Sequence, residues 1–322
     1  MNITMTTAEH PFDMCWDANG LVHVFAENQA DAFRGMGYAA GYERLWQIHL
    51  STLFATGTAA SVMGPRYIAQ DLLHQAFNVP AYDMPDSPGD WVVDAYLEGL
   101  NSYVRSLKEV PAEFLKAGTV PREFTRHDVA SRHRFTGWFQ HKTVMEKIYM
   151  GKLMARHGTA WFKNHLHNFS AADEQSIDEL KDALLSMDAG IGNLLFPNQK
   201  ILSGSNNWAV RGHLTASGKP MLATDPHQPH SIPNTFFYIH LSTPDWDTFG
   251  ATFPGIPYFM MGFNRDVSWG LTTGFIDTFD VFVENEPAPL KKEYVIDVAG
   301  QAPSSFDISL SITHRRTRAI YP

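Results

Sequence analysis

The segment Gly204–His227 constrains the fold of this 322-residue chain more than any other part of the sequence. Its pattern predicts a strand over Ser205–Arg211. Residues 212–219 contain two glycines, a serine and a threonine, which predicts a turn. Residues 220–224 predict the returning strand, and Asp225-Pro226 predicts its end. The segment is therefore expected to form a β-hairpin.

The two ends of this hairpin bear the residues of a possible amino-terminal nucleophile. Antiparallel pairing centred on Ala216 would bring His227 beside Ser205, whereas a shift of one residue would turn the His227 side chain to the other face. Opening the Gly204–Ser205 peptide bond would give Ser205 an α-amine and a hydroxyl, which are a base and a nucleophile on one residue. Gly204 has no Cβ and tolerates the strained geometry of that step. An ordinary hairpin with a surface serine and a structural histidine fits the same pattern.

Composition limits the class of protein and its partners. Hydrophobic residues make up 44% and aromatic residues 13% of the chain, which suits a sizeable core. The net charge of −9 argues against nucleic acid or an anionic membrane as the main partner. Cys15 is the single cysteine, which excludes an internal disulfide and CxxC motifs. The N-terminus, MNITMTTAEHPFDMCWD, lacks the basic and apolar regions of a signal peptide, so the chain as written is expected to remain in the cytoplasm.

Hydrophobic periodicity predicts the other elements. Residues 12–27 are expected to form a hairpin around Asp17-Ala18-Asn19-Gly20, and Asn28 or Gln29 to precede a helix of about 25 residues. Residues 91–108 and 128–157 are expected to form two further helices. Two strands are expected at Phe236–Leu241 and Asp280–Glu284.

Several motifs in order resemble the penicillin acylase family, a branch of the N-terminal nucleophile hydrolases. They are Trp16–Leu50, Gly204–His227, Gly250–Pro257 and Gly262–Glu284. The resemblance implies an α+β fold, part of a four-layer αββα arrangement with a helix-rich α-subunit region. Family precursors continue for several hundred residues further, so the chain is expected to be truncated within the β subunit.

The same resemblance divides the chain into three parts. Residues 1–170 are similar to the α subunit, and residues 171–204 are similar to the spacer peptide that family precursors remove. Residues 205–322 are similar to the first part of the β-subunit nucleophile domain. The implied product of processing is an α/β heterodimer.

The resemblance also implies the chemistry. Ser205 would attack a linear amide and form an acyl-enzyme, and no cofactor would be required for catalysis. His227 would hold the nucleophile, as in the branch of cephalosporin and acyl-homoserine lactone acylases, and the Thr273 N–H would stabilise the oxyanion. The family's side-chain oxyanion donor lies beyond residue 322. Full activity is therefore expected to require the missing remainder of the β subunit.

A calcium site is a second implication of the resemblance. Asp277, Asp280 and the carbonyl of Phe279 match calcium ligands in the penicillin G branch, and two carboxylates with a carbonyl suit a hard cation. Glu146 is a candidate for the remaining ligand, although its spacing does not match cleanly. Two surface acids in a loop are the alternative interpretation.

Two other functions fit parts of the pattern. The chain could be an inactive fragment that serves only as the binding or assembly half of a split acylase. It could also be a metal-dependent hydrolase, because the chain contains 15 histidines. No HExxH or similarly tight ligand spacing occurs among them, which disfavours the metal-dependent hydrolase.

Overall fold

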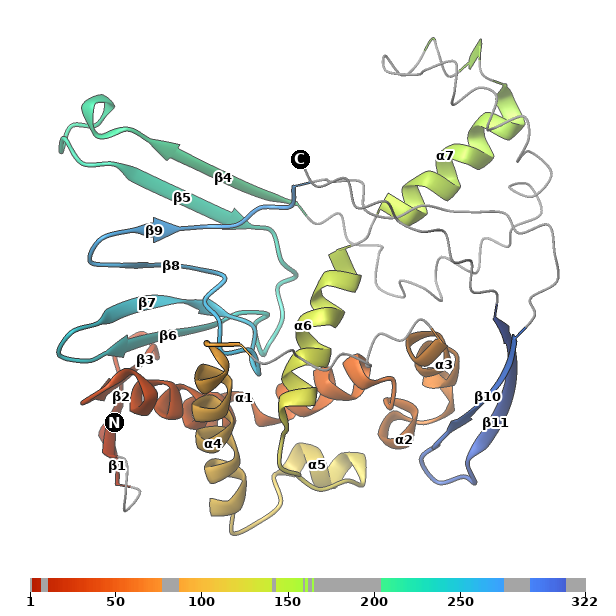
Figure 1. Ribbon diagram of the computed structural model, residues 1–322, viewed down its shortest axis with the longest axis horizontal. Coiled ribbons are helices and arrows are strands. Elements are labelled where there is room, and N and C mark those ends of the chain that lie inside the picture. The colour runs from red at the N-terminus through yellow and green to blue at the C-terminus, as the bar shows by residue number, and fades with distance from the viewer. Residues whose placement is uncertain are drawn as a thin grey trace.

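A computed structural model describes residues 2–6, 11–76, 87–140, 143–158, 160–161, 164, 204–274 and 290–310. Its helices and sheets confirm the α+β class expected from the sequence. Figure 1 shows the sheet on one side and the helices packed against it or extending away from it.

A seven-stranded sheet gathers strands from both sides of residue 204. In sheet order, these are β1 (Asn2–Thr6), β2 (Pro11–Trp16), β3 (Val22–Ala26), β6 (Phe237–Ser242), β7 (Asp247–Thr252), β8 (Met261–Asn264) and β9 (Ser268–Trp269). β3 pairs in parallel with β6, and the other neighbours pair antiparallel. The predicted strand at Phe236–Leu241 is confirmed as β6, whereas Asp280–Glu284 lies outside the described residues.

The predicted turn between β2 and β3 is confirmed. The carboxylate of Asp17 accepts hydrogen bonds from the backbone N–H groups of Asn19 and Leu21, at 2.8 and 2.9 Å. Gly20 takes a φ of +78°, which glycine adopts without steric cost. This local hydrogen bonding, rather than distant packing, accounts for the accuracy of the prediction.

The helices are mostly those expected from the hydrophobic pattern. α1 (Gln29–Thr56) begins after Asn28, whose side chain accepts a hydrogen bond from Asp31 N–H at 3.0 Å and caps the helix. α4 (Asp90–Ser106) is the second predicted helix. The helix expected over residues 128–157 is present as α6 (Arg126–Gln140) and α7 (Thr143–His157), with residues 141–142 outside the described part. The shorter helices are α2 (Ala60–Met63), α3 (Ile68–Ala76) and α5 (Ala112–Ala117).

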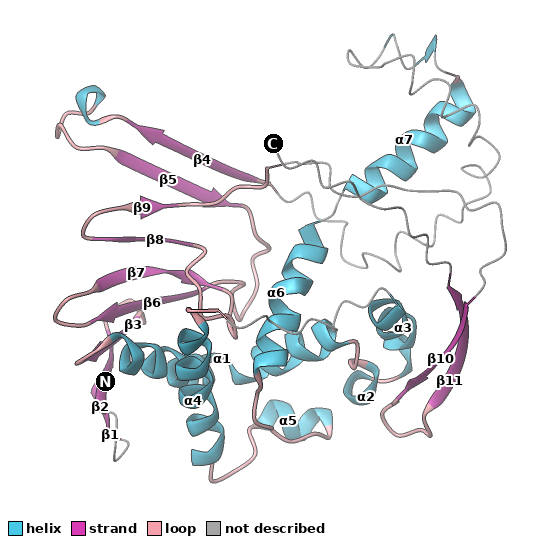
Figure 2. Ribbon diagram, in the orientation of Figure 1, coloured by secondary structure: helices cyan, strands magenta, loops and turns pink. Residues whose placement is uncertain are grey.

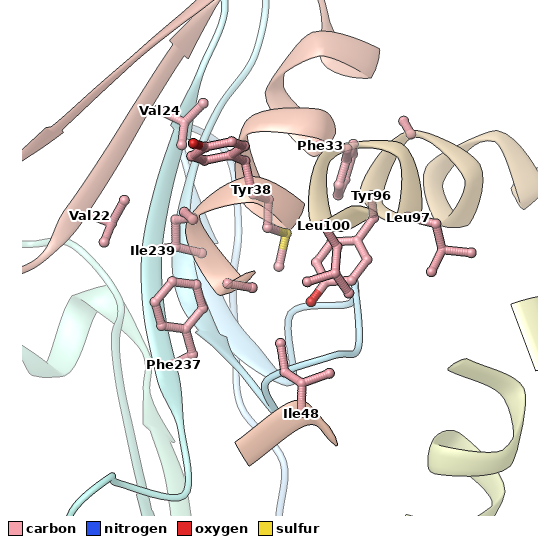
Figure 3. Close-up of a cluster of buried hydrophobic side chains, with 14 of the residues drawn as sticks. Val22, Val24, Phe33, Tyr38, Ile48, Tyr96, Leu97, Leu100, Phe237 and Ile239 are labelled. Carbon is pink, nitrogen blue, oxygen red and sulfur yellow. The ribbon is translucent and has the colours of Figure 1, made fainter. Parts of the chain in front are cut away.

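The main core lies between the sheet and helices α1 and α4 (Figure 3). Alternation places Val22 and Val24 of β3, and Ile239 and Leu241 of β6, on the face toward the helices, where each is at most 1% exposed. Each such side chain contributes about 1.5–3 kcal/mol on burial. The core therefore joins residues that precede and follow position 204.

Two glycines set the separation of α1 and α4. A Cβ at Gly37 would lie 1.9 Å from the carbonyl oxygen of Tyr96, and one at Gly99 would lie 1.8 Å from that of Arg34. Real Cβ atoms essentially never lie this close to another heavy atom. The helices thus touch backbone to backbone at two points.

A second hairpin, β10 (Leu290–Ile296) and β11 (Ser304–Leu310), lies beside α2 and α3 (Figure 2). Ile296 and Val298 pack against Ala60, and Ala299 N–H donates to the Ala60 carbonyl at 2.9 Å. Among the described residues, no helix has the length and apolar character needed to cross a membrane.

Candidate active site

The hairpin that carries Ser205 is present, with a register that differs from the prediction. β4 (Ser205–Val210) pairs antiparallel with β5 (Met221–Pro226), so the returning strand continues two residues beyond its expected end. Ser205 faces Pro226, whereas pairing about Ala216 would have placed it opposite His227. The register is centred between Thr215 and Ala216, because an even number of residues separates the paired Val210 and Met221.

This register places His227 on the other face of the hairpin from Ser205. The His227 backbone N–H donates to the Gly204 carbonyl at 2.8 Å, so these two residues are opposite one another. The His227 Nε2 atom lies 3.2 Å from Asn206 Nδ2 and 3.1 Å from Asp225 Oδ2. Nε2 can accept a hydrogen bond from the amide or donate one to the carboxylate, depending on the tautomer. The expectation that the imidazole lies beside the Ser205 side chain is therefore corrected, while the catalytic role of His227 stays a prediction.

The Ser205 hydroxyl instead lies against Thr272. Ser205 Oγ is 2.7 Å from Thr272 Oγ1, and Thr272 Oγ1 lies 3.3 Å from the Ser205 carbonyl oxygen, to which it can donate. When the Thr272 hydroxyl donates its single proton to that carbonyl oxygen, the lone pairs of Thr272 Oγ1 can accept the proton of the Ser205 hydroxyl. This pair of interactions fixes the direction of the Ser205 hydroxyl.

The backbone at Gly270 packs closely against side chains of the hairpin and brings the Thr272 segment to it. A Cβ at Gly270 would lie 2.6 Å from Thr224 Cβ and 3.1 Å from Asn207 Nδ2, so only glycine fits there. Thr224 pairs with Asn207 across the hairpin. Asn207 is two residues after Ser205 on the same strand, so this pair lies on the same face of the hairpin as Ser205. Residues 270–274 therefore reach the half-buried face that carries Ser205. Figure 2 shows the hairpin lying beyond β9.

Sequence reasoning chose Thr273 in this segment and did not single out Thr272. The resemblance implies a role for the Thr273 backbone N–H, whereas the contact with Ser205 is made by the adjacent Thr272 side chain. Alternation along an extended segment could have indicated Thr272. If the backbone of Thr273 faces the site, the side chain of an adjacent residue is expected to lie close to the nucleophile. The use of the Thr273 N–H in catalysis stays a prediction.

The proposed calcium ligands lie almost entirely outside the described structure. Asp277, Phe279 and Asp280 are outside the described residues, and Glu146 lies on α7 in a stretch whose side chains are not described. In the rest of the described chain, no group of three or more His, Cys, Asp or Glu side chains is arranged to hold a metal ion. The calcium site is thus untested.

Comparison with known proteins gives the family. The penicillin amidase family matches residues 11–305, so the chain belongs to that family. It is 27% identical over 327 residues to penicillin acylase 2 proenzyme of Pseudomonas sp. (strain SE83), covering 91% of this chain and 42% of that protein. It is 24% identical over 284 residues to acyl-homoserine lactone acylase QuiP of Pseudomonas fluorescens (strain Pf0-1), covering 83% of this chain and 35% of that protein.

A solved structure also resembles the chain. The thermostable penicillin G acylase from Alcaligenes faecalis matches with a TM-score of 0.37 and 20% identity, covering 58% of this chain and 94% of that one. The chain spans 42% and 35% of the length of the two curated relatives described above.

Proposed function

We propose that this chain is part of a self-processing acylase that hydrolyses a linear amide with Ser205 as an amino-terminal nucleophile. The observation that carries the proposal is the distance of 2.7 Å between the hydroxyl oxygens of Ser205 and Thr272. Ser205 directly follows Gly204, so its hydroxyl lies next to the peptide bond that would be opened. Membership of the penicillin amidase family supports the reaction class. The names of relatives favour a β-lactam side chain, an N-acyl-homoserine lactone or a related acyl amide as the substrate.

Processing would begin at the Gly204 carbonyl carbon. Ser205 Oγ attacks this carbon, its proton passes to the departing Ser205 nitrogen, and the peptide bond becomes an ester. Water then hydrolyses the ester and leaves a carboxyl on Gly204 and a free α-amine on Ser205. Thr272 supports the first step, because it accepts the Ser205 Oγ–H and leaves the oxygen lone pairs free for attack.

Amide hydrolysis would use the same atoms again. The new α-amine, whose ordinary pKa of about 7.7–8.0 lies close to neutral pH, takes the Oγ proton as Ser205 attacks the substrate carbonyl. The amine of the substrate leaves, and water releases the acyl group as an acid. No cofactor takes part in these steps, the Thr273 N–H keeps its predicted role, and calcium on Asp277 and Asp280 would be structural. His227 would act from the other face of the hairpin, next to Gly204 and Asn206, and not through contact with the Ser205 side chain.

The two products would remain associated as an α/β heterodimer. Core side chains of α1 and α4 pack on β3 and β6, and these elements come from both sides of residue 204. The alternative, in which the chain serves only as the binding or assembly half of a split acylase, predicts no break and no activity of this chain.

The test of processing is the intact mass of the purified chain followed over time. We expect a break before Ser205 that separates residues 1–204 from residues 205–322. The Ser205→Ala variant should stay whole, whereas Ser205→Cys keeps a nucleophile at the same position and should still open. Amide substrates of both named classes are then offered to the opened chain. A break that persists in Ser205→Ala, or amide turnover by a chain still joined at Gly204, would rule out this mechanism.

Thr272 gives a separate prediction about the rate. Thr272→Val removes both hydroxyl interactions while keeping the shape of the side chain, and Thr272→Ser keeps them. Because a misplaced nucleophile typically loses on the order of 10²-fold in rate, we expect Thr272→Val to slow the break by roughly 10- to 100-fold. Thr272→Ser should remain close to the parent. Equal rates for the two variants would show that Thr272 does not orient Ser205.

A further inference from the structure

Two histidines from distant parts of the chain lie side by side on the sheet face that points away from the α1 and α4 core. His23 of β3 is directly opposite His240 of β6 in the parallel register. Their neighbours along each strand, Val22, Val24 and Ile239, are buried against the helices, so alternation places both imidazoles on the opposite face. The Nδ1 atoms of the two rings are 3.0 Å apart.

Each ring has a carboxylate near its other nitrogen. His240 Nε2 lies 3.3 Å from Asp247 Oδ2, which also accepts a hydrogen bond from the Ser242 hydroxyl at 3.1 Å. His23 Nε2 is buried and lies 3.8 Å from Asp17 Oδ2. The Asp17 carboxylate accepts hydrogen bonds from the backbone N–H groups of Leu21 and Asn19, at 2.9 and 2.8 Å, which stabilise its anionic form. A proton on His240 Nε2 can be donated to Asp247, whereas a proton on His23 Nε2 would face Asp17 without a hydrogen bond to it.

The position of the proton on each ring determines whether its Nδ1 atom bears a proton or a free lone pair. A neutral imidazole has one protonated nitrogen, and a proton on Nε2 leaves Nδ1 with a lone pair. Two such lone pairs 3.0 Å apart can bind one metal ion, whereas a proton on either Nδ1 gives a hydrogen bond between the two rings. A neutral ring that instead carries its proton on Nδ1 would direct an Nε2 lone pair toward a carboxylate. With a proton on each Nε2, the two rings therefore offer two nitrogen ligands to one cation.

We propose that His23 and His240 bind a divalent transition metal ion through their Nδ1 atoms. An ion bonded to both nitrogens at about 2.0–2.1 Å would subtend roughly 90° across their separation, which suits the square-planar or octahedral preference of Cu²⁺ or Ni²⁺. Asp17 and Asp247 would act as the carboxylates that orient metal-binding histidines. The side chains of His23 and His240 are 26% and 18% exposed, which leaves access for the ion and for water as the remaining ligands.

The experiment is a titration of the metal-free chain with Cu²⁺, followed by electron paramagnetic resonance, with Ni²⁺ as a second probe. We expect one equivalent of Cu²⁺ to show coupling to two nitrogens. Loss of a ligand in His23→Gln or His240→Gln should weaken binding by more than about 100-fold, and Asp247→Asn by about 10- to 100-fold. His213→Gln alters an exposed histidine in the turn of the other hairpin, and serves as the matched control with unchanged binding.

Equal metal binding by His23→Gln, His240→Gln and the parent would overturn the proposal. Failure of the parent chain to bind Cu²⁺ or Ni²⁺ at neutral pH would also overturn it, and would leave a proton as the group shared by the two rings. If either histidine variant fails to fold, Asp247→Asn tests the same geometry from outside the coordination sphere. The titration is also run on Ser205→Ala. The metal site does not depend on the chain break, so failure of processing and failure of metal binding are distinguishable.

Discussion

Replacing Gly99 with alanine is expected to prevent the α1–α4 layer from packing. The added Cβ would lie 1.8 Å from the Arg34 carbonyl oxygen and 2.7 Å from its carbon, both backbone atoms of α1. No side chain can rotate to make room, so the helices must separate and expose the core between them. We expect a loss of more than about 4–5 kcal/mol in the free energy of unfolding, or no folded protein. Urea unfolding followed by circular dichroism measures this.

The matched control is the same substitution at Gly137. This glycine lies on the exposed side of α6, and a Cβ there would meet no atom within 4 Å. Alanine favours a helix interior over glycine by about 1 kcal/mol, so Gly137→Ala should stabilise the chain slightly. An unfolding midpoint for Gly99→Ala that equals the parent's would contradict the helix contact.

Gly255→Ala is expected to have the second large effect, because it disturbs a buried cation. Arg132 of α6 is 7% exposed and donates hydrogen bonds to the Ile48 carbonyl at 3.1 Å, the Ser51 hydroxyl and the Pro254 carbonyl. Burial lowers the pKa of Arg132 to about 10, which still leaves it charged at neutral pH. A Cβ at Gly255 would lie 2.9 Å from Arg132 Cζ and Nε.

The expected cost of Gly255→Ala has two parts. Gly255 has a φ of +89°, which strains any other residue by about 1–2 kcal/mol. Displacement of the guanidinium from its acceptors adds the penalty of a poorly paired buried charge, about 3–5 kcal/mol. Gly118→Ala isolates the first part, because Gly118 has a φ of +67° and no atom within 4 Å of the added Cβ. Equal destabilisation in the two variants would show that contact with Arg132 costs nothing.

Local chemistry made some of these elements predictable. The Asn28 cap, the Asp17 turn and the helical spacing of α1 and α4 depend on residues within a few positions of one another, and each was located from sequence. The Ser205 hairpin was predicted for the same reason. Its register was missed by one residue, because an approximately symmetrical turn does not specify whether an odd or even number of residues separates the strands.

Contacts between distant segments had no such local signal. The pairing of His23 with His240 joins residues 217 positions apart, so no pattern of neighbouring residues could have indicated it. The Thr272–Ser205 contact joins residues 67 positions apart, and only the folded chain reveals which side chain of that segment reaches the hydroxyl.

The parallel pairing of β3 with β6 has a consequence for a chain opened before Ser205. Residues 22–25 would belong to one product and residues 239–242 to the other, yet both remain neighbours in a single sheet. Folding of the joined chain is unimolecular, whereas reassembly of separated products is bimolecular. The thermal midpoint of the opened form should therefore rise with protein concentration, while that of the uncut Ser205→Ala chain stays constant.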